Sequence, residues 1–309
     1  MGHQPGFAIQ SDRLTRSPIT FRFGYLAPIG ATGTIRPFGI FCISSNFPEP
    51  PAMTRRYYVP DLRTQAPIVQ LPDEEASHAS RVMRVQTGDW IELFDGCGHQ
   101  ADAEVVTVSK RECVVRCDAI KAVDREPSVA IDLAIGLPKP DRAKEMIERL
   151  TELGVARVFP IVFERTQRPP KDNFLDKLRR IVIESCKQSG RNVLMTIESP
   201  TDFASFAETI AANNSISDEG DAPSSWQRVL VAMPDSPPLN AMDVNQNDMG
   251  QSDVNGRPST LALIGPEGGL SEAEHQRCID IGAESIGLGR RILRIETAAA
   301  IVAARLVVD

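Results

Sequence analysis

The chain has 309 residues, of which 42% are hydrophobic and 24% are charged, and its formal net charge is -7. This length suits two domains with separate cores, since single domains usually contain about 100 to 200 residues. The negative charge argues against a protein that coats nucleic acid without selectivity, because phosphate binding depends on lysine and arginine. No apolar run approaches the roughly 20 residues that a membrane span needs. The composition therefore predicts a soluble protein with two domains.

Two local features refine this prediction. Basic residues outnumber acidic ones between Lys139 and Lys187, which allows a local surface that binds an anionic partner. The six cysteines include no Cys-x-x-Cys pair and have no neighbouring histidine cluster, so the sequence predicts neither a zinc site nor a disulfide scaffold. We expect buried thiols in a reducing cytoplasm.

The first 53 residues differ from the rest of the chain. They are rich in Gly, Pro, Ser and Phe, with four arginines against two acids and no sustained periodicity. An organelle transit peptide has this character. Met53 also resembles a natural start, and we favour a start-site artefact or a disordered tail. We therefore expect residues 1–53 to lie outside the folded domains.

Short strands separated by turns follow over residues 54–127. Strands are predicted at residues 90–94, 103–108 and 112–117, and the hairpin signals between them are Asp95-Gly96 and a polar corner at residues 109–111. One helix is expected around residues 73–83. This pattern predicts a small β-barrel of about 70 residues.

From residue 128 onward strands alternate with helices. Residues 129–137 form a buried-strand run, Asp141 caps an amphipathic helix that ends at Gly154, and a strand at residues 157–162 precedes a helix that ends at Gly190. This alternation predicts an α/β domain with a mainly parallel sheet over residues 128–309. Two polar stretches, near residues 213–226 and 240–259, are predicted loop insertions.

The stretch LALIGPEGGLSEAE, residues 261–274, carries the strongest single signal. An apolar strand stops at a Gly-Pro-Glu-Gly-Gly turn, and Ser271 and Glu274 then match a capping box at a helix start. Glycines let a ligand lie against the backbone, and loops at the carboxyl ends of parallel strands are where α/β proteins bind ligands. A ligand site is therefore predicted, although a plain tight turn has the same pattern.

A second stretch, SIGLGRRILRIETAAAIVAARLVV, covers residues 285–308. A short strand leads through Gly289 into a loop with Arg290, Arg291 and Arg294, and a nearly all-apolar helix follows from Glu296. Such a helix must pack inside its own domain or against a partner chain. A dinucleotide-binding loop is excluded, because GLGRRI lacks the third glycine of that motif.

Together, IGPEGGLSEAE, LGRRILRIETAA, the upstream LPKPDRAKEMIERLTELGV and RRYYVP near residue 55 resemble the family of 16S ribosomal RNA uracil-N3 methyltransferases. This family belongs to the SPOUT class. The resemblance covers residues 54–309 and implies a C-terminal SPOUT α/β trefoil-knot domain, a small N-terminal PUA-like β-barrel that binds RNA, and a homodimer. The chain departs from the family pattern at Arg149, Arg290 and Ile295, where lysine, proline and threonine are usual.

The resemblance also implies which residues bind the cofactor, S-adenosylmethionine. The loops at residues 265–269 and 288–297 would form the knot and hold the cofactor with their backbones. The implied cofactor-binding residues are Leu263, Ile264, Gly265, Pro266, Glu267, Gly268, Gly269, Leu288, Gly289, Ile292, Leu293, Arg294, Glu296, Thr297 and Ala298. No metal is expected, because the sulfonium of the cofactor carries its own activation.

Catalytic and RNA-binding residues follow from the same resemblance and from the chemistry of uracil. Uracil N3 carries a proton, and a guanidinium can stabilise the anion that its loss creates, so Arg291 and Arg294 are the candidate catalytic residues, with an arginine of the β-barrel as the alternative. The implied RNA-binding residues are Arg55, Arg56, His78, Arg81, Arg84, Lys139 and Arg165. The target base must be unpaired or flipped, because N3 lies on its Watson-Crick edge.

The leading hypothesis is methylation of N3 of a specific uridine in 16S ribosomal RNA, with free rRNA or the small ribosomal subunit as the substrate. Two alternatives stay open. One is a SPOUT methyltransferase that acts on another RNA, and the other is an inactive RNA-binding factor in ribosome assembly. Cofactor binding without methyl transfer would distinguish the inactive factor from both enzymes.

Overall fold

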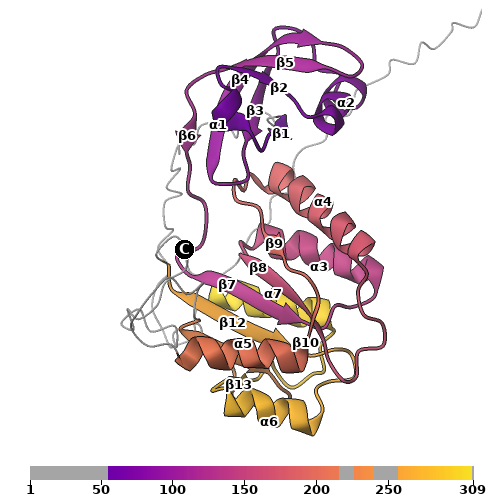
Figure 1. Ribbon diagram of the computed structural model, residues 1–309, viewed down its shortest axis with the longest axis vertical. Coiled ribbons are helices and arrows are strands. Elements are labelled where there is room, and N and C mark those ends of the chain that lie inside the picture. Colours follow the sequence, from indigo (N-terminus) through magenta and orange to yellow (C-terminus); the bar gives the residue numbers. More distant parts are fainter. Residues whose placement is uncertain (1–54, 216–225, 240–256, 308–309) are drawn as a thin grey trace, which may run out of the picture. The chain divides into compact units, whose positions relative to one another are not determined.

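The computed structural model describes residues 55–215, 226–239 and 257–307, which form two β-sheets with their helices (Figure 1). The predicted leader and most of the two predicted insertions lie outside these residues. No helix of the described residues is both long enough and apolar enough to cross a membrane.

The first sheet is antiparallel except for one pair of strands. Its order is β1-β3-β4-β5-β2, with β6 paired to β4, and β1 runs parallel to β3. The strands are β1 (Arg56–Tyr58), β2 (Ile68–Gln70), β3 (Trp90–Phe94), β4 (His99–Val108), β5 (Cys113–Cys117) and β6 (Lys121–Ala122). The helices α1 (Leu62–Gln65) and α2 (Asp73–Arg81) accompany them.

Alternating side chains give this sheet its core. Ala101, Ala103 and Val105 of β4 are buried, while the residues between them are more exposed. Cys113 and Cys117 are buried on β5, as their spacing predicts. Strand β4 begins earlier than the predicted residue 103, because its first residues pair with β3 and β6. These pairings depend on contacts that lie outside the local pattern.

The second sheet is parallel in every pairing between described strands, which confirms the predicted α/β domain. Its order is β10-β8-β7-β12-β11-β13, with β9 also paired to β8. The strands are β7 (Ala130–Ile135), β8 (Arg157–Val162), β9 (Thr196–Ile197), β10 (Thr201–Asp202), β11 (Arg228–Ala232), β12 (Ser259–Ile264) and β13 (Glu284–Ile286).

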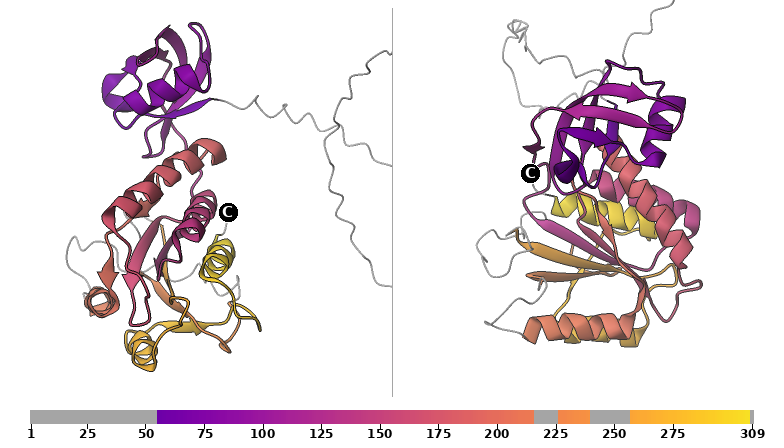
Figure 2. Two further views of the ribbon diagram at one scale, coloured as in Figure 1. Left: turned by 90° about the vertical axis from the view of Figure 1, so that its right-hand side faces the viewer. Right: turned by 45° about the horizontal axis from the view of Figure 1, so that its top comes forward.

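Helices cover both faces of this sheet (Figure 1, Figure 2). One face carries α3 (Pro140–Glu152), α4 (Asp172–Ser189) and α7 (Ile295–Leu306), and the other carries α5 (Phe203–Ser215) and α6 (Glu272–Asp280). Leu133 of β7 packs in the first core, and its neighbour Ala134 packs in the second. Strands β7 and β12 are buried at every position for this reason, and so they appear in the sequence as unbroken apolar runs.

Two helix boundaries agree with the predicted signals and one differs. Asp141 does not cap α3: Lys139 is the N-cap residue, its side chain makes no cap hydrogen bond, and Asp141 lies within the first turn. Gly190 ends α4 in the left-handed conformation, with φ of 82°, and Ser271 and Glu274 form the predicted capping box of α6. The apolar helix α7 packs inside its own domain, because Ala299, Val302 and other residues of one face share a core with α3. The sequence leaves open whether this helix packs internally or against a partner, and the structure shows internal packing for that face.

Candidate functional site

Two loops meet at the carboxyl ends of the central strands. Ile135 of β7 and Ile264 of β12 are paired there, and the N–H of Gly136 donates to the carbonyl of Ile264 at 3.0 Å. A β-carbon on residue 136 would lie 2.9 Å from the backbone nitrogen of Pro266. The glycine-rich loop is therefore in direct contact with the loop after β7, at the edge of the sheet where α/β proteins bind ligands.

The arginine-bearing loop begins at the same edge, after β13. The N–H of Gly287 donates to the carbonyl of Pro237 at 2.6 Å, which ties this loop to the segment after β11. The chain then runs through Gly289 to Arg294, whose carbonyl accepts the first hydrogen bond of α7 from Ala298 at 2.9 Å. The structure thus brings the two predicted cofactor loops to one edge of the sheet.

Both loops offer backbone with open space beside it. Gly269 and Gly289 have φ angles of +70° and +107°, which residues with a side chain rarely adopt. A β-carbon at either position would meet nothing within 4 Å. A ligand can therefore approach the main chain at both positions.

The predicted cofactor-binding residues differ in their exposure. Leu263, Ile264, Pro266, Glu296 and Ala298 are buried, Gly265, Leu288 and Leu293 are partly buried, and Glu267, Gly268, Gly269, Gly289, Ile292, Arg294 and Thr297 are exposed. The buried members set the course of the backbone, and the exposed members lie where a ligand can reach them.

Glu296 is a buried carboxylate in the first turn of α7. Its side-chain Oε1 lies 3.7 Å from Nε of Arg142 on α3, and its Oε2 has no hydrogen-bond partner among the described residues. A buried carboxylate oxygen is costly unless a donor reaches it. Glu296 can therefore accept a hydrogen bond from a hydroxyl or amino group of a ligand. The sequence-based prediction includes Glu296 but misses Arg142.

The two candidate catalytic arginines are free to meet a substrate. Arg291 and Arg294 are exposed, and neither guanidinium forms a hydrogen bond or an ion pair within the described part of the chain. Ile292 lies between them with 98% of its surface exposed. The loop therefore presents three positive charges that are unpaired among the described residues, those of Arg291, Arg294 and the equally exposed Arg290, and one fully exposed apolar side chain beside the predicted cofactor site.

Arg165 contacts the glycine-rich loop. Its Nη1 donates to the carbonyl oxygens of Gly268 at 3.0 Å and Leu270 at 3.1 Å. A β-carbon on residue 268 would lie 3.1 Å from Cβ of Arg165. The sequence-based interpretation attributes the glycines of this loop to the cofactor, and for Gly268 the structure adds a reason within the chain.

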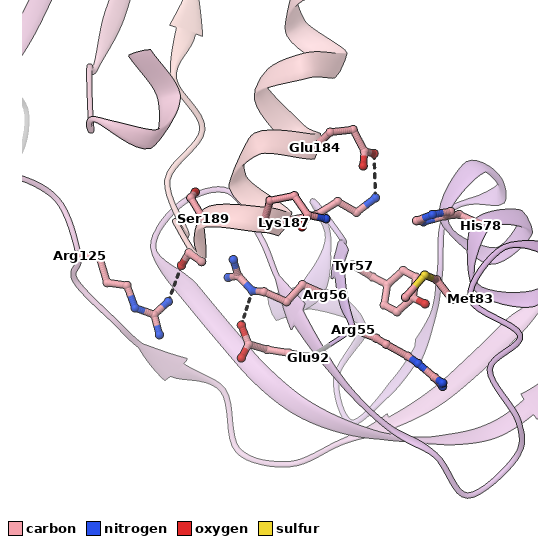
Figure 3. A pocket seen from close by; sticks show the side chains of 12 residues that line it. Arg55, Arg56, Tyr57, His78, Met83, Glu92, Arg125, Glu184, Lys187 and Ser189 are labelled. Carbon is pink, nitrogen blue, oxygen red and sulfur yellow. Dashed lines mark hydrogen bonds and ion pairs between the residues drawn. The ribbon is translucent and has the colours of Figure 1, made fainter. Parts of the chain in front are cut away.

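Three of the predicted RNA-binding residues line one cavity of about 300 Å³ (Figure 3). Arg55 immediately precedes β1, Arg56 lies in β1, and His78 lies in α2. The basic lining residues are Arg55, Arg56, Arg125 and Lys187, and the acidic ones are Glu92 and Glu184. The other predicted RNA-binding residues, Arg81, Arg84, Lys139 and Arg165, are exposed and do not line this cavity.

Arg56 is held firmly by the chain. Its Nε donates to Glu92 at 2.5 Å, its Nη1 donates to the carbonyl of Cys186 at 2.6 Å, and its Nη2 donates to Asn192. Burial, opposed by the Glu92 carboxylate, lowers the pKa of Arg56 below its usual range. Arg56 thus links β1 to the end of α4. Arg55 pairs with Asp89 but keeps 35% of its side chain exposed, so it can reach a ligand.

Polar atoms without partners also border this cavity. The hydroxyl of Tyr57 and Nδ1 of His78 are buried and have no hydrogen-bond partner among the described residues. Lys187 is neutralised by Glu75 at 2.8 Å and Glu184 at 2.9 Å, and burial raises the pKa of Glu75. The sequence-based prediction misses Lys187 and Arg125, because neither has a local signal that distinguishes it from a surface residue.

Candidate metal ligands and cysteines are scattered in the described ranges. No group of three or more His, Cys, Asp or Glu residues there is arranged to hold a metal ion. All five described cysteines are free, and only Cys97 among them is exposed.

Two family models match the sequence. One is described as an RNA methyltransferase domain and matches residues 125–307, and the other is described as an RNA methyltransferase PUA domain and matches residues 71–116. The matched ranges contain the α/β sheet and most of the antiparallel sheet, respectively.

Curated relatives and solved structures agree with these models. The chain is 30% identical over 239 residues to ribosomal RNA small subunit methyltransferase E of Synechocystis sp., covering 77% of this chain and 72% of the relative. It is 29% identical over 260 residues to the protein of the same name from Bacillus subtilis, covering 79% and 92%.

Among solved structures, methyltransferase E of Neisseria gonorrhoeae bound to S-adenosyl methionine has a TM-score of 0.67 at 26% identity, covering 81% of this chain and 95% of that one. A methyltransferase from Legionella pneumophila in complex with the same cofactor has a TM-score of 0.68 at 26% identity, covering 81% and 96%.

Proposed function

This chain belongs to the RNA methyltransferase family, and from that premise we propose that it uses S-adenosylmethionine to methylate N3 of a uridine in 16S ribosomal RNA. The fold is the SPOUT α/β fold with an N-terminal PUA domain, and the trefoil knot follows from the family. The observation that carries the proposal is that two loops with open backbone begin at the same edge of the parallel sheet, and that one of them bears the free guanidinium groups of Arg291 and Arg294.

The cofactor would lie along the loops at residues 265–269 and 288–293. When bound, S-adenosylmethionine supplies an electrophilic methyl group on its sulfonium. The open backbone at Gly269 and Gly289 lets the main chain contact a ligand directly, and the unpartnered Oε2 of Glu296 can accept one of its hydrogen bonds. Glu296 is held in place by its contact with Arg142.

Arg294 and Arg291 would act on the uracil. Loss of the N3 proton leaves negative charge shared between N3 and the two carbonyl oxygens of the base, and a nearby guanidinium stabilises that charge. The backbone of Arg294 is fixed at the start of α7, where its carbonyl accepts hydrogen bonds from Thr297 at 3.0 Å and Ala298 at 2.9 Å. A fixed backbone limits the positions that its side chain can reach, which favours an aligned attack.

The barrel would hold the RNA strand. A base reacts at N3 only when it is unpaired or flipped, so the protein must grip the flanking nucleotides. Arg55 and His78 line the cavity, and Arg81 and Arg84 are exposed at the end of α2 and beyond it. We propose that these residues and Lys139 contact RNA, and that Arg56 acts by holding the cavity wall.

We also propose that the chain is a homodimer in a reducing cytoplasm. The exposed Ile292 beside Arg291 supports a partner surface at the cofactor loop, since an apolar side chain with 98% exposure is costly to leave in water. The free cysteine thiols of the described residues are consistent with a reducing cytoplasm. Light scattering of the native protein and of Ile292→Asp measures the oligomeric state. A monomeric native protein would refute the proposed dimer.

One experiment separates this function from its alternatives. Purified protein is incubated with radiolabelled S-adenosylmethionine and with unmodified small subunits, free 16S rRNA, large subunits or transfer RNA. We expect label in 16S rRNA, free or assembled, and in neither of the other RNAs. Label in transfer RNA or 23S rRNA would support a different RNA substrate, and cofactor binding without transfer to any RNA would support an inactive assembly factor.

A further inference from the structure

The loop after β8 is fastened to the glycine-rich loop at two places. Arg165 donates from Nη1 to the carbonyls of Gly268 and Leu270. The backbone N–H of Glu164 donates to Oε1 of Glu274 at 2.7 Å, and Glu274 Oε2 accepts from the N–H of Ser271 at 2.8 Å. One segment therefore holds both the end of the loop and the helix cap that follows it.

The segment that carries Arg165 is itself well ordered. The hydroxyl of Thr166 accepts a hydrogen bond from the N–H of Phe163 at 2.8 Å, and the N–H of Thr166 donates back to the Phe163 carbonyl at 3.0 Å. The ring of Phe163 is buried and stacks on Phe203 of α5 with ring centroids 5.3 Å apart. The turn at residues 163–166 thus fixes the point from which Arg165 reaches out.

The hydrogen bonds of Arg165 complete the restraint of two peptide groups. The peptide between Gly268 and Gly269 is held at its carbonyl by Arg165 and at its N–H by the carbonyl of Pro266, at 2.8 Å. The peptide between Leu270 and Ser271 is held by Arg165 and by Glu274 in the same way. Both ends of both peptides are therefore hydrogen-bonded within the chain before any ligand arrives.

We propose that Arg165 is a positioning residue for the cofactor, which shapes residues 265–270 in advance and thereby raises the affinity for S-adenosylmethionine. This inference rests on the proposed assignment of that loop to the cofactor. Binding to a preformed loop avoids the entropy cost of ordering it, so loss of the restraint weakens binding. It also gives Arg165 a role that differs from the RNA contact predicted from sequence.

Three variants separate these roles. Arg165→Ala removes both hydrogen bonds, and Arg165→Lys keeps the charge and a donor. Arg168→Ala removes one positive charge from an exposed position in the same loop. The affinity for S-adenosylmethionine is measured by calorimetry without RNA, the affinity for 16S rRNA is measured separately, and hydrogen exchange is followed on the cofactor-free proteins.

We expect Arg165→Ala to bind S-adenosylmethionine about tenfold more weakly, with Arg165→Lys closer to the native protein and Arg168→Ala unchanged. The N–H groups of Gly269 and Ser271 should exchange faster in cofactor-free Arg165→Ala, while the core strands exchange at native rates. This local pattern distinguishes a loosened loop from a destabilised domain.

Two results would overturn the inference in different ways. A native protein that binds the cofactor, together with an Arg165→Ala variant of equal cofactor affinity and weaker RNA affinity, would assign Arg165 to the RNA. A native protein that binds no S-adenosylmethionine would refute the proposed function itself and this inference with it.

Discussion

Gly136 and Pro266 lie so close together that a β-carbon on residue 136 would be 2.9 Å from the nitrogen and 3.0 Å from the α-carbon of Pro266. The atoms of Pro266 that fill this space belong to its backbone and its rigid ring, and not to a flexible side chain. The loop after β7 and the glycine-rich loop after β12 therefore cannot move independently at this point. Arg142 follows Gly136 in the first turn of α3 and contacts Glu296, so the contact between Gly136 and Pro266 connects the proposed cofactor loop to this ion pair.

Gly136→Ala should weaken cofactor binding. The added methyl group forces Pro266 away and shifts the loop behind it, with a stability loss of about 1 to 3 kcal/mol from overpacking. We expect the dissociation constant for S-adenosylmethionine to rise by about tenfold or more. Gly282→Ala is the control, because residue 282 has φ of +83° but open space around it. Gly282→Ala should lose stability while its affinity for S-adenosylmethionine stays native. Equal cofactor affinities in the two variants would show that the loop after β7 and the glycine-rich loop are not coupled.

Arg294→Ala should slow methyl transfer and leave cofactor affinity nearly unchanged. Removing one group that stabilises developing negative charge typically lowers kcat by about 100-fold to 1,000-fold. Single-turnover methylation of 16S rRNA and cofactor calorimetry measure the two quantities. Arg290→Ala controls for the loss of charge in the same loop and should keep most of the rate. If the kcat of Arg294→Ala were similar to that of Arg290→Ala, and within about a few fold of the native value, a catalytic role for Arg294 would be excluded.

Arg56→Ala should destabilise the protein strongly. The side chain of Arg56 is 6% exposed and that of its partner Glu92 is 14% exposed, so the substitution leaves a nearly buried carboxylate without its main partner. Such losses cost about 3 to 5 kcal/mol, whereas Arg55→Ala removes a more exposed pair and should cost about 1 kcal/mol or less. Urea unfolding measures the free energy of unfolding of both variants. Equal values would show that Arg56 contributes no more to stability than Arg55.

Glu75 gives the stability a pH dependence of known sign. Burial raises its pKa above the ordinary glutamate value, so between those two values the folded protein binds more protons than the unfolded chain. Its contribution to stability is therefore present below the ordinary value and is lost as the pH rises through the raised one. Glu75→Gln should remove this loss, and Glu74→Gln, at a neighbouring residue with 82% side-chain exposure, should not. Unfolding curves between about pH 4 and pH 8 measure it. If the native protein became more stable relative to Glu75→Gln as the pH rises through that range, the predicted sign would be wrong.

Native thiols should react selectively. Burial raises the pKa of Cys113, Cys117 and Cys186 to about 11 and that of Cys278 to about 12, whereas Cys97 is exposed. The thiolate is the reactive form, so these four cysteines should resist iodoacetamide near pH 8 while Cys97 is alkylated. Peptide mass mapping before and after denaturation reads out each site. Rapid alkylation of Cys186 in the native protein would show that the end of α4 opens readily.

Local patterns predict the elements that depend on local physics. The continuous apolar runs of β7 and β12 and the capping box at Ser271 and Glu274 need only their own residues, and they appear as predicted. Strands β1 and β2 have three residues each and are missed, because a short strand is defined by its partner. Tyr57 of β1 pairs with Leu93 of β3, a relationship that no local window contains.

The same division applies to the site. The two loop motifs predict the cofactor region through the family resemblance, and in the structure both loops begin at one edge of the sheet. The contact of Arg165 with Gly268 joins residues 103 positions apart, and the Arg142–Glu296 pair joins two different helices. Nothing in either local sequence distinguishes these arginines from surface residues. The helix α5 and the strand β11 are also missed, because they flank a polar stretch that dominates the pattern around them.

The identity of the methylated nucleoside distinguishes methylation of uracil N3 from every other methyl transfer to the ribosomal RNA. Small ribosomal subunits that lack N3-methyluridine are treated with the purified protein and S-adenosylmethionine, digested to nucleosides and analysed by mass spectrometry against synthetic standards. We expect N3-methyluridine as the new nucleoside, with far less of it formed by Arg294→Ala in the same time. Methyl transfer that yields a ribose-methylated or a C5-methylated nucleoside would contradict the assignment of Arg294 to a uracil anion, and with it the proposed reaction.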